Sequence, residues 1–325
     1  MWGFSFSAKA FGSMLSNKTS MKEWTDVLNR SNTRNEKTGI LPILKLSYDD
    51  VPSHLKQCFA FCAVFPKDYV IDVEILIQLW MAHDFIPLKE GDHLEKVGRE
   101  FFYELAWRSF FQDVKRTPKK GWNQLHFRTV CKIHDLMHDI ALSVMGKDCV
   151  TIVDRPNQKE LLSAGPTRHM FSSYDLIGTL LDDYWKIHSP SIQTLLYPDS
   201  KTYGSATHLS KYNHLRELQL CKSTKLPLLP RQLQHLRYLD LSNNWEMEEL
   251  PKEISVLYNL QTLNLSNCFL LGRLPKDMKY MTNLRHLYTN GCTSLECMPP
   301  DLGQLTSLQT LNTFCGGFWS WLQYC

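Results

Sequence analysis

The chain has 325 residues, of which 43% are hydrophobic and 21% are charged, and its formal net charge is +3 at pH 7. This length allows about two domains with sizeable cores, and the composition is ordinary for a soluble globular protein. A charge this close to balance argues against nucleic acid or a membrane surface as the main partner.

Targeting signals and cysteine usage indicate a cellular compartment. The apolar N-terminus, MWGFSFSAKAFGSML, is interrupted by Lys9 and is followed by no clear cleavage site, so we expect no signal peptide. No run of about 18 apolar residues exists, and we expect no transmembrane helix. Ten irregularly spaced cysteines without a secretory leader predict a reducing compartment. The predicted location is the cytoplasm, with the nucleus as the alternative.

The N-terminal half has the pattern of a helical domain that ends in a small β-hairpin. Apolar residues recur at helical spacing in six segments, with a break at Pro52 and an N-cap residue at Ser53. Residues 124–130 alternate like a strand, and TPKKGW before them has the composition of a hairpin tip. Helices followed by a β-ribbon predict a winged helix. The predicted helices cover residues 22–31, 40 to the break at 52, 53–65, 72–86, 93–114 and 132–144.

The stretch KIHDLMHDIA, residues 132–141, raises the question of a metal site. It holds His134 and His138, which would share one face of a helix, and Asp135 stands where zinc proteases have Glu. No third ligand is evident, and a broad apolar face favours an ordinary packed helix. A cysteine pair within 53–65 also lacks a second Cys/His pair at zinc-finger spacing. We therefore predict no metal.

A repeat of about 24 residues fills the C-terminal half. Segments such as HLRELQL and NLQTLNL recur at intervals of 21, 24, 24 and 24 residues, and a Leu-Pro or Met-Pro pair keeps the same step. This is the pattern of a leucine-rich repeat, in which each turn of chain buries its leucines against its neighbours in a solenoid. The segments begin at His214, His235, Asn259, Asn283 and Ser307, and degenerate copies begin at Thr167 and Ser191.

Two features of the repeat have an expected structural or binding role. The third residue after the last strand leucine, which is Asn244, Cys268 or Cys292, should hydrogen-bond the bent backbone. The residues between the strand leucines should be exposed on the concave face, and their mixture of charged, amide and aromatic groups suits protein recognition. The predicted partner-binding residues are Arg216, Glu217, Gln219, Arg237, Tyr238, Asp240, Gln261, Thr262, Asn264, Arg285, His286 and Tyr288.

The order of these segments resembles the plant NB-LRR disease-resistance proteins of the coiled-coil group. The resemblance rests on residues 41–86, on LAWRSFFQDV (105–114), on KIHDLMHDIA and on the repeats that follow, and it covers nearly all of 8–313. It implies a multidomain α plus α/β solenoid fold, with a helical winged-helix domain followed by leucine-rich repeats. The implied domains are a remnant of the NB-ARC helical subdomain (1–35), the winged helix (36–160) and the repeats (161–325).

The resemblance also implies a function. Members of the family sense a pathogen effector or a modified host protein through their repeats, and exchange of ADP for ATP opens them. The family's Met-His-Asp motif falls at Ile133, His134 and Asp135, so His134 and Asp135 are the implied nucleotide-binding residues. Contacts with an NB-ARC module, within the chain or between chains, are implied as well. No enzymatic activity is expected.

The chain departs from the family where nucleotide chemistry is concerned. A Walker A loop needs G-x-x-x-x-G-K-[ST], and the only Gly-Lys here is Gly146-Lys147, which Asp148 follows. We therefore expect a truncated receptor that holds no ADP or ATP of its own. The alternatives are a non-functional gene fragment and a winged-helix DNA-binding regulator, although helix 72–86 has three carboxylates and no Lys or Arg to meet phosphates.

Overall fold

The computed structural model describes residues 40–87, 93–119, 126–153, 165–173, 191–198, 212–222 and 233–313, with a few positions before residue 26. These residues form two compact units, and the boundary between the units lies between Gly146 and Lys147. The predicted remnant domain, 1–35, lies almost entirely outside the described residues. Within it, Ser20 and Glu23 form a reciprocal capping box. The backbone N–H and the hydroxyl of Ser20 each donate to the Glu23 carboxylate at 3.0 Å, and the Glu23 backbone N–H donates to the Ser20 hydroxyl at 3.3 Å.

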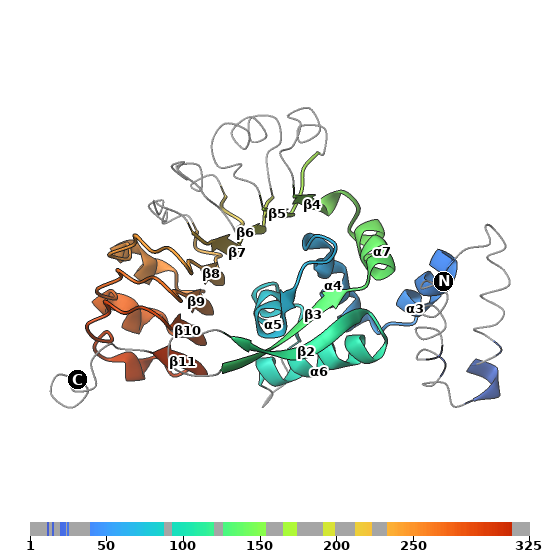
Figure 1. Ribbon diagram of the computed structural model, residues 1–325, viewed down its shortest axis with the longest axis horizontal. Helices are drawn as coiled ribbons and strands as arrows, with labels where there is room; N and C mark the ends of the chain where they lie inside the picture. The colour runs from blue at the N-terminus through green and yellow to red at the C-terminus, as the bar shows by residue number, and fades with distance from the viewer. Residues whose placement is uncertain are drawn as a thin grey trace. The chain divides into compact units, whose positions relative to one another are not determined.

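The first unit contains five described α-helices and a three-stranded sheet (Figure 1). The antiparallel hairpin β2–β3 forms most of this sheet, and the short strand β1 pairs with the other edge of β3. The elements are α3 (Ile40–Asp49), α4 (Ser53–Phe61), the 3-10 helix η1 (Cys62–Val64), β1 (Ile71–Asp72), α5 (Val73–Ala82), α6 (Leu94–Trp107), β2 (Phe111–Lys119), β3 (His126–Ile133) and α7 (Asp135–Met145).

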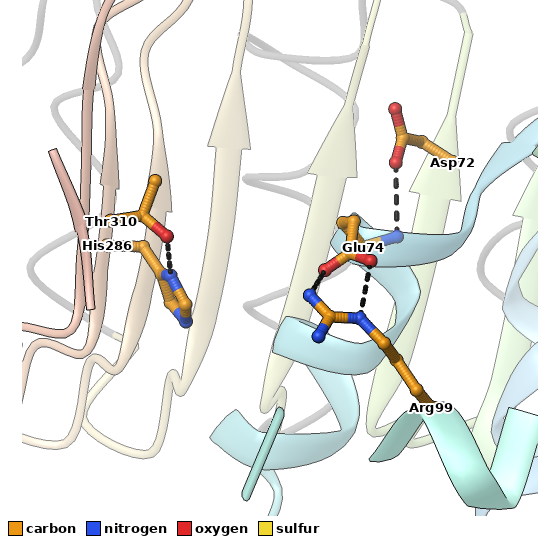
Figure 2. A network of polar contacts seen from close by, with 5 residues as sticks. All are labelled: Asp72, Glu74, Arg99, His286 and Thr310. Carbon is orange, nitrogen blue, oxygen red and sulfur yellow. Dashed lines mark hydrogen bonds and ion pairs between the residues drawn. The ribbon is translucent and has the colours of Figure 1, made fainter. Parts of the chain in front are cut away.

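Side-chain chemistry explains how α5 and α6 begin and pack. Asp72 caps α5 by accepting a 3.1 Å hydrogen bond from the Glu74 backbone N–H. Glu74 in turn holds α6 through two hydrogen bonds from Arg99, at 2.8 and 2.9 Å (Figure 2). Gly98 lets the helices approach closely, because a Cβ there would lie 2.5 Å from Ile77.

Three predicted boundaries in this unit are wrong. Ser53 is the first helical residue of α4 rather than its cap, because Pro52 occupies the cap position. The helix predicted over 93–114 ends at Trp107, and the chain then enters β2. Residues 132 and 133 belong to β3, since hydrogen bonding to β2 outweighs their helical spacing, and α7 begins only at Asp135.

The second unit is a solenoid built on one parallel eight-stranded sheet, whose strands follow one another in chain order (Figure 1). The two degenerate repeats predicted at Thr167 and Ser191 contribute strands, as expected. A further strand begins at Cys149, ahead of residue 161, where we placed the start of the repeats. The strands are β4 (Cys149–Ile152), β5 (His169–Ser172), β6 (Thr194–Tyr197), β7 (Glu217–Leu220), β8 (Tyr238–Asp240), β9 (Thr262–Asn264), β10 (His286–Thr289) and β11 (Thr310–Thr313).

The repeat leucines form one continuous core on one face of this sheet. Short 3-10 helices lie on the return path between strands: η4 (Lys252–Val256), η5 (Lys276–Tyr280) and η6 (Leu302–Gln304). The prolines of two of the repeating Leu-Pro pairs, Pro251 and Pro275, immediately precede η4 and η5. The Leu-Pro pair of the preceding repeat, Leu229-Pro230, lies outside the described residues. The fold class, a helical winged-helix domain followed by a leucine-rich-repeat solenoid, is therefore confirmed.

The predicted backbone role of Asn244, Cys268 and Cys292 is confirmed. Asn244 is fully buried and donates to the carbonyls of Leu220 and Leu241, at 2.9 and 2.6 Å. The thiols of Cys268 and Cys292 lie 3.2 and 3.1 Å from the equivalent carbonyls. Among the described residues, no helix has the length and apolar character needed to cross a bilayer.

Candidate functional site

His134 lies at the N-terminus of α7, where it acts as the helix cap. Its Nδ1 accepts a 3.2 Å hydrogen bond from the Leu136 backbone N–H. Burial lowers the pKa of the imidazole, although the neighbouring carboxylate of Asp135 opposes this effect. A neutral ring whose Nδ1 accepts must carry its proton on Nε2, which can therefore donate to an acceptor such as a phosphate oxygen. Asp135 is exposed in the first turn of the helix, where its charge suits the helix dipole.

His138 has a structural role. It is buried, and its Nε2 lies 2.7 Å from the carbonyl oxygen of Phe65. A carbonyl only accepts, so Nε2 carries the proton and the ring links α7 to the turn after η1.

The two histidines do not form the metal pair that their spacing suggested. His134 precedes α7 as its cap, so it does not share a helix face with His138, which lies inside the helix. Within the described part of the chain, no group of three His, Cys, Asp or Glu side chains is placed to hold a metal ion.

The face of the second unit's sheet opposite the leucine core carries two rows of side chains. Because the strands are parallel and in register, equivalent residues of successive repeats lie side by side. The first row is His169, Thr194, Glu217, Tyr238, Thr262, His286 and Thr310, and the second row is Phe171, Leu196, Gln219, Asp240, Asn264, Tyr288 and Asn312.

Hydrogen bonds run along the first row. The Thr194 hydroxyl donates to Glu217 Oε2 at 2.8 Å and lies 2.9 Å from His169 Nδ1. Since a hydroxyl has one proton, His169 must be the donor to Thr194. Farther along, His286 Nδ1 lies 3.1 Å from the Thr310 hydroxyl (Figure 2).

Asp240 is the centre of a second cluster, which joins the two rows. One of its carboxylate oxygens accepts from the Gln219 amide at 3.2 Å and from the Tyr238 hydroxyl at 3.3 Å. The other accepts a 2.9 Å hydrogen bond from the Ser242 backbone N–H. Burial raises the pKa of the Tyr238 phenol, which keeps its proton available for the carboxylate.

The predicted exposure of the partner-binding residues is wrong for five of them. Glu217, Tyr238, Asp240, Thr262 and His286 are buried, and the other seven are half-buried. Strands in register place these side chains about 4.8 Å from their neighbours, so each shields the next, and the hydrogen bonds along the rows draw them together.

A third row, which the sequence analysis did not identify as a unit, lies at the start of the strands. Each of seven repeats has Arg or Gln immediately before its strand, and the backbone N–H of each of the last six donates to the carbonyl of the previous one at 2.8 Å. The first, Arg168, donates at 2.9 Å to the carbonyl of Asp148, which precedes β4. We call this set the arginine–glutamine row. Its seven members carry four guanidinium groups and no carboxylate, but Asp148 holds the next position of the series, and its carboxylate lies 3.8 Å from the Arg168 guanidinium. Its members are Arg168, Gln193, Arg216, Arg237, Gln261, Arg285 and Gln309.

Comparison with known proteins identifies both units. Residues 64–141 match the disease resistance protein winged helix domain, and residues 196–320 match the leucine-rich repeat region. Disease resistance protein RGA2 of Solanum bulbocastanum is 44% identical over 144 residues, which is 44% of this chain and 14% of that protein. RGA1 of the same species, a candidate disease resistance protein, is 36% identical over 251 residues, which is 75% of this chain and 22% of that protein.

Among solved structures, the Arabidopsis receptor kinase HAESA, in complex with the peptide hormone IDA and the co-receptor SERK1, has a TM-score of 0.35 at 16% identity. The match covers 50% of this chain and 29% of that one. The chain spans 14% and 22% of the length of the two Solanum proteins.

Proposed function

Because the chain belongs to the plant disease-resistance proteins, which join a winged-helix domain to leucine-rich repeats, we propose that it functions as a cytoplasmic immune receptor. The repeat sheet binds a pathogen effector or a host protein that an effector has modified. The winged helix takes part in regulating the receptor through contacts with an NB-ARC module. The protein acts by binding and not by catalysis.

The arginine–glutamine row is the observation that carries the recognition part of this proposal. Guanidinium and amide groups all donate hydrogen bonds, and a guanidinium can engage a carboxylate with two of them. Successive members lie one strand apart, and Arg216 and Arg237 are adjacent in the row. The row therefore suits a protein surface rich in Asp and Glu.

The polar rows beside it favour protein over nucleic acid as the ligand. Glu217 and Asp240 are carboxylates on the same sheet, and they would repel a phosphate backbone. Their hydrogen bonds to Thr194, Gln219 and Tyr238 also hold the surface in one conformation. A surface that is already ordered loses less side-chain entropy when a partner binds.

For the winged helix, we propose that His134 contributes one hydrogen bond to a nucleotide held mainly by an NB-ARC module. Its Nε2–H suits a phosphate oxygen, whereas the exposed Asp135 carboxylate does not, because two anions repel. The nearby lysines Lys67 and Lys132 already pair with Asp139 and Asp68. We expect the chain alone to bind ADP and ATP weakly or not at all. Submicromolar binding in titration calorimetry would contradict this.

The recognition proposal can be tested with matched charge reversals. The chain would be co-expressed in leaves with a panel of pathogen effectors, and effector binding would then be measured on purified protein. Arg216→Glu combined with Arg237→Glu should weaken binding at least tenfold. The control, Lys252→Glu with Lys276→Glu, changes the net charge equally at exposed positions of η4 and η5. Equal affinity of both double variants, or no effector bound by the wild type, would refute the proposal.

A further inference from the structure

A second surface of the solenoid lies on the turns that follow β8 and β9, away from the rows described above. Trp245 and Phe269 occupy equivalent positions in successive repeats, and their rings stack with centroids 6.4 Å apart and planes at 26°. Trp245 remains 55% exposed, and Leu270 beside Phe269 is 49% exposed. Tryptophan is among the residues that contribute most to binding energy at protein interfaces, and here more than half of its surface is available to a partner.

The backbone beneath the stacked rings is fixed by a regular set of hydrogen bonds. Asn244, which precedes Trp245, is fully buried and bonds two carbonyls. Asn243 and Asn267 have positive φ angles of 61° and 62°, and the amide of Asn267 donates to the side chain of Asn243 at 2.9 Å. The two turns are thus held in register with each other, and the ring pair is positioned before any partner arrives.

The surroundings of the rings are acidic. Glu246, Glu248 and Glu249 are exposed, and none of them forms an ion pair with another residue that the structure describes. Arg273 in the next repeat forms a backbone β-bridge with Glu249, but its guanidinium pairs with Glu296 at 2.8 Å. The surface therefore combines an open indole ring with three uncompensated carboxylates.

We propose that Trp245, Phe269, Leu270 and the three glutamates form a docking surface for a basic segment of another protein, one that carries Lys or Arg beside apolar side chains. A cation of this segment lies over the indole face and pairs with the glutamates, and its apolar side chains cover Leu270 and the stacked rings. The same carboxylates repel nucleic acids and anionic lipid headgroups, because both present phosphates. The surface does not continue into the repeat after Phe269, because the equivalent residue there is the polar Thr293.

The test uses random 12-residue peptides displayed on phage and selected on the immobilised full chain. We expect one class of enriched peptides in which Lys or Arg alternates with apolar residues, and this class should lose binding to the Trp245→Ser chain. Acidic peptides, if enriched, would be ligands of the arginine–glutamine row and should bind the Trp245→Ser chain as well as the wild type. Their affinities would then be measured by fluorescence polarisation. Trp245→Ser should weaken binding at least tenfold, and so should Glu246→Lys combined with Glu248→Lys. Binding should also weaken as salt concentration rises.

A matched control is Tyr258→Ser, which removes another aromatic side chain that is 56% exposed but lies outside the surface. Its affinity for the selected peptides should equal that of the wild type. Phe269→Ser provides a second variant in case Trp245→Ser lowers the yield of folded protein. Failure to enrich any basic peptide, equal losses in the control and in Trp245→Ser, or self-association of the chain through Trp245 in sedimentation runs would each overturn the proposal.

Discussion

The buried amide of Asn244 offers the sharpest test of how the solenoid is held together. Asn244→Ala removes two hydrogen bonds, of 2.9 and 2.6 Å, from carbonyls that no water can reach, because the residue is fully buried. The Leu241 carbonyl still accepts from the Cys268 thiol at 3.2 Å, so losing the amide there costs about 1 kcal/mol, whereas losing the bond to the buried Leu220 carbonyl costs about 1–3 kcal/mol. The expected loss of unfolding free energy is therefore about 2–4 kcal/mol. In a unit of this size, each kcal/mol shifts Tm by about 2–4 °C. We therefore expect the repeat transition to fall by about 5–15 °C.

Differential scanning calorimetry is the suitable assay, because it resolves separate transitions of the two units. Asn259→Ala is the matched control, since the Asn259 amide donates a single 2.7 Å hydrogen bond to the Gln234 carbonyl at an exposed position. It should lower Tm by only a few degrees. The Tm of Asn244→Cys should lie between those of Asn244→Ala and Asn259→Ala, since the thiols of Cys268 and Cys292 fill the same role as weaker donors. A Tm for Asn244→Ala equal to that for Asn259→Ala would refute the reasoning.

Three further predictions concern close packing and burial. Gly98→Ala would place a Cβ 2.5 Å from an isoleucine side chain, and we expect it to destabilise the first unit by about 1–3 kcal/mol in thermal melts; an unchanged melt would contradict the close approach. Gly291→Ala should destabilise the second unit by about 1–2 kcal/mol, because φ is +78° and the Cβ would meet an asparagine oxygen at 2.6 Å. The matched change Gly303→Ala meets nothing within 4 Å and should be neutral. Iodoacetamide at pH 8 should modify exposed Cys297 and spare Cys149, because burial raises the pKa of the Cys149 thiol to about 12; peptide mapping that shows equal labelling would disprove this.

The sequence was sufficient to predict the architecture of the repeats. Leucine spacing depends only on the period of the chain, so it located seven of the eight strands of the solenoid sheet, including the two degenerate ones at Thr167 and Ser191, and missed β4, which begins at Cys149. It also assigned Asn244, Cys268 and Cys292 to the backbone, because that role requires only a donor at one position of each turn. Four members of the arginine–glutamine row (Arg216, Arg237, Gln261 and Arg285) were among the predicted partner-binding residues, but they were not separated from their neighbours as a row, because that requires the register of the strands.

Only the tertiary structure decided what individual polar side chains do. His134 and His138 are four residues apart in the sequence, but pairing of β3 with β2 extends the strand to Ile133 and makes His134 a cap. The Phe65 carbonyl that engages His138 is 73 residues away. Burial of Glu217 and Asp240 likewise depends on side chains from neighbouring strands. Local periodicity determines which face of an element a residue occupies, whereas hydrogen-bond partners and burial come from segments distant in the chain, which folding brings together.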